Sequence, residues 1–262
     1  MMQNGEQAPL LTAEGVTHDF GALRACDDIS LEVFPGEVLC IAGESGSGKT
    51  TLLRILSGRL APSEGRVTCR SDDGLEHDLY ALDEAARRQL MRSHWGIVEQ
   101  NPRDGLRMGV SAGANVGEPL MALGRRHYGS LRATALDWLG KVEIAQERVD
   151  DLPQTFSGGM QQRLQIARNL VTGPRLVFMD EPTGGLDVSV QARLLDLLGG
   201  LVAQLDLAAI IVTHDLAVAR LLAHRLVVMR HGEVVETGLT DQLLDDPQHA
   251  YTQLLVSSVL QA

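Results

Sequence analysis

The chain has 262 residues, of which 44% are hydrophobic and 22% are charged, an ordinary composition for one large globular domain or two small ones. Its formal net charge of -11 argues against nucleic acid or an anionic membrane surface as the main partner. The three cysteines, Cys26, Cys40 and Cys69, form no CxxC pair and no metal spacing, which is typical of a reducing cytosol.

The N-terminal residues 1–7 are polar and lack the basic and then apolar pattern of a secretion signal. We find no apolar run that approaches the roughly 18 residues needed to span a membrane. These features predict a cytoplasmic protein with no direct membrane insertion.

The chain is predicted to begin with strands at residues 10–19 and 30–33, followed by a turn at residues 34–37. Residues 38–42 then form a short apolar run that is typical of a buried strand. Ahead of this run lies Phe20, which from the residues alone is a plain strand-end aromatic, with stacking on an adenine ring as the alternative.

Residues 43–50, with the sequence GESGSGKT, fit the phosphate-binding loop pattern GxxxxGK[ST] without a mismatch. An apolar strand precedes them and residues 49–56 predict a helix, so the context argues against a chance glycine-rich turn. Glycines let the backbone approach a ligand, and N–H groups at a helix N-terminus then face its phosphates. Lys49 adds a positive charge, and the Thr50 hydroxyl is a ligand for Mg²⁺. The predicted nucleotide contacts in this loop are Gly43, Glu44, Ser45, Gly46, Ser47, Gly48, Lys49, Thr50 and Thr51.

After the loop, residues 66–69 and 96–99 predict short strands, the second ending at Gln100. Between them residues 83–92 predict a helix, with Asp83 as its N-cap.

The character of the chain changes after Gln100. Residues 101–114 carry four glycines or prolines and no clear period, whereas residues 117–141 are helical in pattern. We therefore predict that residues 101–154 form a helical subdomain inserted beside the sheet.

A second glycine turn, FSGGMQQR at residues 156–163, opens a predicted helix that runs through Val171. A helix N-terminus attracts anions, and Ser157 suits a capping role there. From the residues alone, an N-capped helix after a loop is an equally open interpretation.

Residues 175–181 predict an apolar strand that ends in two carboxylates, Asp180 and Glu181. Adjacent acids beside a buried strand are costly unless a cation lies near, and the alternative is an acidic solvent-exposed end. In phosphate-loop enzymes the first acid holds Mg²⁺, and an acid just after it is placed to polarise water. The phosphate loop upstream favours that interpretation.

Residues 208–213 predict another buried strand, with His214 at its C-terminal end. Ligands of such sheets collect at the C-terminal ends of the strands, so Glu181 and His214 are expected on the same edge as Gly43.

Three further features complete the predicted chain. A helix through about Leu205 is expected to kink or end at its two adjacent glycines, residues 199–200. Residues 226–229 and 233–236 predict a hairpin. The tail from residue 240 is predicted to be helical. The predicted packing residues of this tail are Leu254, Leu255 and Val259.

Together these motifs resemble the nucleotide-binding domain of the ABC ATPases from residue 10 to about residue 240. The resemblance rests on GESGSGKT, Gln100, FSGGMQQR, LVFMDE, GGLD and His214 in this order. It implies an α/β fold of the ABC-type P-loop NTPases, which is a RecA-like core with a β-sheet subdomain and an inserted helical subdomain. The implied division is an ABC domain at residues 8–240 and a helical tail at residues 241–262.

The resemblance implies ATP and Mg²⁺ as cofactors and a role for each matching residue. Phe20 would stack on the adenine, and Asp180 would support the metal together with Thr50 and Gln100. Gln100 would also sense the attacking water. Glu181 would be the general base.

The remaining implied roles concern the γ-phosphate and a second ABC subunit, either an identical chain or a paralogue. His214 would contact the γ-phosphate, and Asp187 would lie at the dimer interface. One chain would then hold half of each site, and two ATP molecules would close a head-to-tail dimer. The residues that would reach ATP on the other subunit are Ser157, Gly158, Gly159, Met160 and Gln161.

The predicted helical subdomain, here called the helical block, indicates a narrower group within the ABC ATPases. The segments DGLR, VSAGAN and RHYG, with TGGLDVSV at residues 183–190, are similar to the soluble ABC ATPases of bacterial carbon–phosphorus lyase systems, which break down phosphonates. The resemblance implies an ATPase that docks on a soluble lyase core.

Two alternatives remain at this point. The tail segment YTQLL is similar to ATP-binding subunits of oligopeptide, dipeptide or nickel importers. Met160 stands at the position where the motif LSGGQ has glutamine. Gly184 and Gly185 replace the commoner Ser-Ala pair. These departures leave open how fast ATP is hydrolysed and how tightly the dimer closes. A module in which ATP binding matters more than hydrolysis is the third interpretation.

Overall fold

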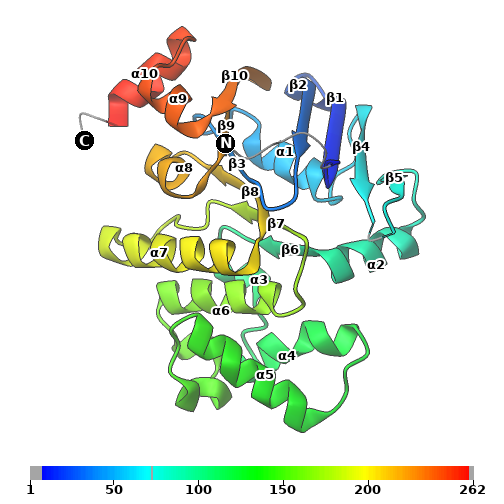
Figure 1. Ribbon diagram of the computed structural model, residues 1–262, viewed down its shortest axis with the longest axis vertical. Coiled ribbons are helices and arrows are strands. Elements are labelled where there is room, and N and C mark those ends of the chain that lie inside the picture. The colour runs from blue at the N-terminus through cyan, green and yellow to red at the C-terminus, as the bar shows by residue number, and fades with distance from the viewer. Residues whose placement is uncertain (1–7, 72, 260–262) are drawn as a thin grey trace.

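The computed structural model describes residues 8–71 and 73–259, and the N-terminal residues 1–7 and the last three residues of the predicted tail lie outside this range. The strands are β1 (Leu11–Phe20), β2 (Leu23–Val33), β3 (Val38–Ala42), β4 (Glu64–Arg70), β5 (Glu76–Asp78), β6 (Trp95–Val98), β7 (Leu176–Asp180), β8 (Ala208–Thr213), β9 (Arg225–Arg230) and β10 (Glu233–Leu239). The helices are α1 (Lys49–Leu56), α2 (Glu84–His94), α3 (Pro102–Gly105), α4 (Ala112–Ala122), α5 (Tyr128–Lys141), α6 (Gly158–Leu170), α7 (Val188–Leu205), α8 (Leu216–Leu222), α9 (Thr240–Asp245) and α10 (Ala250–Val259), with short 3-10 turns η1 (Gln146–Asp150) and η2 (Pro153–Thr155). Figure 1 shows the strands in the upper part of the molecule with α1, α8, α9 and α10 beside them, and α4, α5 and α6 at the opposite end.

Among the described residues the strands form two sheets. One is antiparallel with the order β2-β1-β4-β5, and the other has the order β10-β9-β3-β8-β7-β6. In the second sheet β3, β6, β7, β8 and β9 run parallel, and β10 closes it as an antiparallel hairpin with β9. The predicted α/β class and the predicted hairpin are therefore confirmed.

The parallel sheet separates two apolar cores. Alternate residues of β8 point to opposite faces, as the period of a strand requires. Ala209 and Ile211 join the core shared with α4, α5, α6 and α7. Ile210 and Val212 join the core shared with α1 and the antiparallel sheet. Burial on both faces explains why the predicted strands at residues 38–42 and 208–213 are continuous apolar runs.

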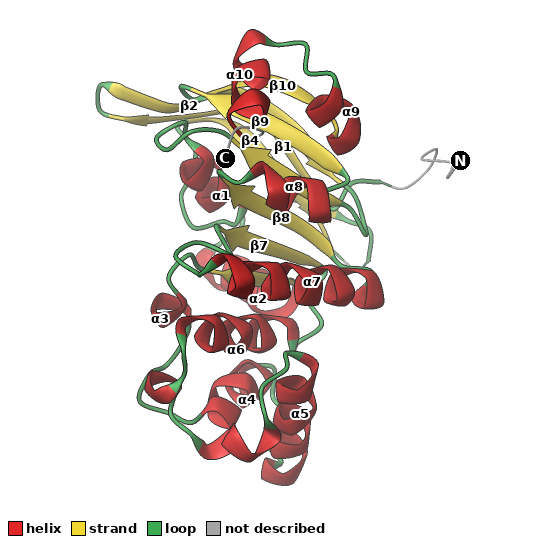
Figure 2. Cartoon of the chain, turned by 90° about the vertical axis from the view of Figure 1, so that its left-hand side faces the viewer, coloured by secondary structure: helices red, strands yellow, loops and turns green. Residues whose placement is uncertain are grey.

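Helices make up the lower part of the molecule. Every residue of 101–154 is described and none lies in a strand. Figure 2 shows α4 and α5 farthest from the strands, with α6 between them and the sheet. Contacts of α4 with both α5 and α6 bury Val116, Leu120 and Leu139 in this core.

Several predicted boundaries were wrong. Strand β2 begins at Leu23 rather than at residue 30. The prediction missed its first half because that part is a polar hairpin arm without apolar alternation. Helix α7 continues through Gly199 and Gly200, because its face with Leu194 and Leu198 is buried. Pro247 lies in a break that divides the predicted tail helix into α9 and α10. Leu254 is exposed rather than packed.

Within the described part of the chain, α7 is long and apolar enough to cross a membrane by length and composition alone. This corrects the prediction that no segment approaches that length. Leu194, Leu195, Leu198 and Leu201 of α7 are buried in the core beneath the sheet, which is the pattern of a core helix with one apolar face.

Candidate nucleotide site

The glycines of the phosphate loop are required by how closely the loop packs on its neighbours. Gly43 and Gly48 have φ angles of 150° and 102°, which favour glycine. A Cβ atom on Gly43 would lie 2.2 Å from the carbonyl oxygen of Met229 in β9. A Cβ atom on Gly48 would lie 2.0 Å from the carbonyl oxygen of Ala25 in β2. The loop is therefore held between these two strands at the start of α1.

Lys49 is folded back into this loop. Its ammonium donates hydrogen bonds of 2.7 Å to the carbonyl oxygens of Gly43 and Glu44. Burial lowers the pKa of Lys49, and the nearby carboxylates of Glu181 and Asp180 oppose that shift. The buried cation is thus held by backbone carbonyls that a phosphate chain would have to join or replace.

Asp180 and Thr50 offer two hard oxygen ligands to a cation. The Thr50 hydroxyl donates a hydrogen bond of 3.2 Å to Asp180 Oδ1. Burial raises the pKa of Asp180, and the neighbouring Glu181 adds to this effect. This donor set fits Mg²⁺, which prefers carboxylate and hydroxyl oxygens and completes its shell with phosphates and water. The described residues contain no cluster of three His, Cys, Asp or Glu side chains for a metal, so such a shell would depend on the nucleotide.

Glu181 and His214 meet at the C-terminal edge of the parallel sheet. Glu181 Oε2 lies 2.8 Å from His214 Nδ1. The Glu181 backbone has a left-handed φ of 43°, and its N–H donates to the carbonyl of Val212 in β8. The structure therefore brings the phosphate loop, both acids and His214 to one sheet edge, as predicted.

Gln100 follows β6 near the same edge. A Cβ atom on Gly184 would lie 3.7 Å from Gln100 Cγ, so the turn after the acids and Gln100 are neighbours. The residue before it, Glu99, is held by Gln165 of α6, whose amide accepts from the Glu99 N–H at 2.5 Å and donates to its carbonyl at 3.2 Å. Sequence reasoning missed Gln165, although a glutamine among apolar residues of one helix face was a usable signal.

Phe20 ends β1, and its ring is 52% exposed. The ring meets the buried His18 imidazole edge to face at a centroid distance of 4.6 Å. The Phe20 ring is thus held by a neighbouring ring while about half of the residue stays accessible to a flat ligand.

The glycine turn before α6 is separate from the phosphate loop. Figures 1 and 2 show α6 beside the helical part and α1 among the strands. Ser157 caps α6 by accepting from the Met160 N–H, as predicted, and it is exposed. A Cβ atom on Gly159 would lie 2.5 Å from Val190 Cγ1, so this turn packs on the first turn of α7. The Arg148 guanidinium donates to the Met160 sulfur at 3.5 Å.

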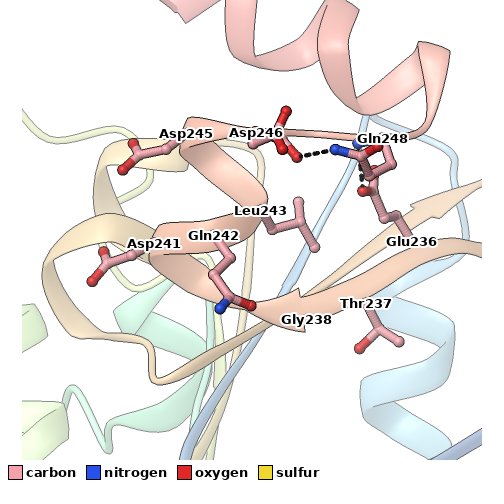
Figure 3. A pocket seen from close by; sticks show the side chains of 9 residues that line it. All are labelled: Glu236, Thr237, Gly238, Asp241, Gln242, Leu243, Asp245, Asp246 and Gln248. Carbon is pink, nitrogen blue, oxygen red and sulfur yellow. Dashed lines mark hydrogen bonds between the residues drawn. The ribbon is translucent and has the colours of Figure 1, made fainter.

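A hollow of about 610 Å³ lies elsewhere, between β10 and α9. Figure 3 shows its lining, in which Glu236, Asp241, Asp245 and Asp246 are acidic. Negative side chains disfavour a phosphate chain, so this hollow is unsuited to a nucleotide.

Comparisons with known proteins agree with this geometry. The family model described as ABC transporter matches residues 26–184. The chain is 65% identical over 97% of its length to the Escherichia coli protein PhnK, described as a putative phosphonates utilization ATP-binding protein, and the match covers 98% of that protein. It is 38% identical over 90% of its length to the Escherichia coli dipeptide transport ATP-binding protein DppF, covering 69% of that protein.

Solved structures show the same fold. A dimeric ATP-binding cassette in a post-hydrolysis state with ADP and Pi has a TM-score of 0.77 and 30% identity, over 88% of this chain and 98% of that one. The cbiO1 protein of Clostridium perfringens, part of the ABC transporter complex cbiONQ, has a TM-score of 0.80 and 26% identity, over 92% of each chain.

Proposed function

The chain belongs to the ABC transporter family and is an ATPase, and we propose that its ATP hydrolysis drives a soluble phosphonate-degrading complex. The observation that carries this proposal is the 65% identity over nearly the full length of a putative phosphonates utilization ATP-binding protein, against 38% for a dipeptide transport protein. The helical block, with its DGLR and RHYG segments, is the part that would select the partner.

In this proposal the phosphate loop binds the nucleotide. The loop residues 43–51 present backbone N–H groups and the Lys49 ammonium to the phosphates, and Phe20 stacks on the adenine. Thr50 and Asp180 would hold Mg²⁺ together with Gln100, and the ion would supply positive charge to the phosphates.

Glu181 then accepts a proton from the water that attacks the γ-phosphate. His214 orients the Glu181 carboxylate through their contact of 2.8 Å. The imidazole is 64% exposed, which leaves it accessible to the γ-phosphate. Backbone N–H groups at the start of α6 complete the site from a second subunit, because their own chain holds them apart from its phosphate loop.

The proposed assembly is a head-to-tail dimer with an identical chain or a paralogue, in the cytoplasm, docked on carbon–phosphorus lyase core subunits. Nucleic acid is not a partner, and the chain does not insert into a membrane. Residues 8–240 act as the ABC domain, residues 101–154 as its helical subdomain, and residues 241–262 as the tail.

Affinity purification tests the partner. The tagged chain, isolated from its own cells growing on a phosphonate as the phosphorus source, is expected to bring down lyase core subunits identified by mass spectrometry. Recovery of membrane permeases without lyase subunits would contradict the proposal. A matched chain carrying the exposed substitution Tyr128→Ala on α5 indicates whether the helical block forms the contact.

The importer alternative is supported by the dipeptide transport relatives. Vesicles that contain the cognate permease and this chain would then take up substrate when ATP is supplied on the side of the chain. A turnover near background in the complete complex would instead favour a module that uses ATP binding alone.

A further inference from the structure

We propose that Tyr251 in the C-terminal helix α10 is a positioning residue for the phosphate-binding loop. Its phenolic oxygen accepts a hydrogen bond of 3.0 Å from the backbone N–H of Glu44, the second residue of the loop. The two residues are 207 positions apart in the chain, so the C-terminal tail contacts the phosphate-binding loop directly.

The Tyr251 ring is fixed before its hydroxyl reaches the loop. Tyr251 is 4% exposed and belongs to the same buried apolar cluster as Cys40 and Ala42 of β3, the strand that leads into the loop. The Arg230 guanidinium lies 4.8 Å from the ring centroid, in the geometry of a cation–π contact. Because the ring is held in this way, the position of the phenolic oxygen is fixed as well.

The residues that lead into α10 are also fixed. The Glu236 carboxylate of β10 accepts from the N–H groups of Gln248 at 2.8 Å and His249 at 3.1 Å, and Figure 3 shows Glu236 reaching Gln248. His249 Nδ1 in turn accepts from the Tyr251 N–H at 3.1 Å. These bonds fix the position of the Tyr251 backbone relative to β10.

The hydrogen bond acts on one peptide group of the loop. The Glu44 N–H and the Gly43 carbonyl belong to the same planar peptide unit. Tyr251 binds its N–H, while the Lys49 ammonium donates to its carbonyl at 2.7 Å. Rotation of that peptide would break both contacts. The tyrosine hydroxyl thus holds the carbonyl that positions the phosphate-binding lysine.

The test removes only the hydroxyl. Tyr251→Phe keeps the ring and its packing, and we expect the KM for ATP and the Kd for a fluorescent ATP analogue to rise by roughly fivefold, the size of one neutral hydrogen bond. The kcat at saturating ATP should be unchanged, and the Glu44 amide should lose protection from hydrogen exchange. Tyr128→Phe, at an exposed tyrosine of α5, is the matched control and should change none of these values.

Each other result overturns the proposal. Unchanged protection of the Glu44 amide would show that the hydrogen bond is absent in solution. Lost protection with unchanged ATP affinity would show that the bond does not position the loop. Loss of protection that extends to the amides of the central strand β8 would show that Tyr251 supports the fold generally rather than the loop.

Discussion

At the scale of single residues, the two neighbouring acids after β7 have different partners. Asp180 accepts from the Thr50 hydroxyl, whereas Glu181 contacts His214. The backbone of Glu181 is left-handed, which is uncommon for a residue with a Cβ atom. The proposed function assigns Asp180 to the metal and Glu181 to the proton of the attacking water.

Replacement of the general base should separate binding from chemistry. Glu181→Gln keeps the shape of the side chain but removes the proton acceptor, so hydrolysis should fall by about 10²- to 10⁴-fold. ATP binding should remain. Phosphate release and nucleotide binding are measured side by side, with the exposed Glu147→Gln as control. Unchanged hydrolysis would show that Glu181 is not the base.

Lys49 of the phosphate loop should determine the affinity for ATP. Lys49→Ala removes the cation of the loop, and loss of charge-assisted hydrogen bonds predicts ATP binding about 10- to 100-fold weaker. Lys141 is the other lysine of the sequence, and Lys141→Ala is therefore the matched control. Equal affinity in the two variants, measured by isothermal titration, would refute the site.

The cysteines should be inert in the folded protein. Burial raises the pKa of Cys26 and Cys40 to about 12 and that of Cys69 to about 11. The reactive thiolate is then scarce at neutral pH. A thiol reagent at pH 8 should modify the native protein slowly and all three cysteines after denaturation. Rapid modification of the native protein would contradict this burial.

The sequence was sufficient for residues that belong to motifs, because a phosphate loop or an acid pair is contiguous. It was insufficient for Gln165 and Tyr251. Their partners lie 66 and 207 positions away in the chain. A glutamine on an apolar helix face signals that Gln165 has a role, but no local pattern identifies so distant a partner. The role of each site residue in catalysis stays a prediction for the variants above.

At the scale of elements, the predictable segments are those whose environment is uniform. Strands β3 and β8 are buried along their whole length, so their apolar runs marked both ends correctly. The first half of β2 pairs with β1 but carries Arg24, Asp27 and Asp28, and its polarity hid the strand. Tertiary pairing decided its structure rather than local preference.

Helix α6 links the glycine turn to the strand end that carries Gln100. Gln165→Ala would leave the Glu99 N–H and carbonyl without partners, at a cost of about 1–3 kcal/mol in the free energy of unfolding. We expect hydrolysis to fall while ATP binding is kept, because the phosphate loop is untouched. Urea unfolding and phosphate release measure the two effects, with the exposed Gln89→Ala as control. If the free energy of unfolding and the rate of phosphate release both equal those of the unsubstituted protein, Gln165 does not support the strand end that carries Gln100.

At the scale of the whole molecule, the proposed function divides the nucleotide site into two halves that lie apart within one chain. The loop, both acids and His214 share a sheet edge, whereas the turn before α6 lies with the helical part (Figure 2). A related cassette has been solved twice as a dimer, once with ADP and Pi bound. A head-to-tail dimer joins the two halves without requiring either to move far within its own chain.

The most direct test is the mass of the Glu181→Gln protein in solution with ATP and Mg²⁺, measured by light scattering. We predict twice the 28.3 kDa of one chain with ATP and one chain mass without it. The double variant Glu181→Gln with Ser157→Arg should bind ATP equally well and stay at one chain mass, because only the turn before α6 is changed. A single-chain mass for Glu181→Gln at saturating ATP, or a dimer in the double variant, would contradict the composite site.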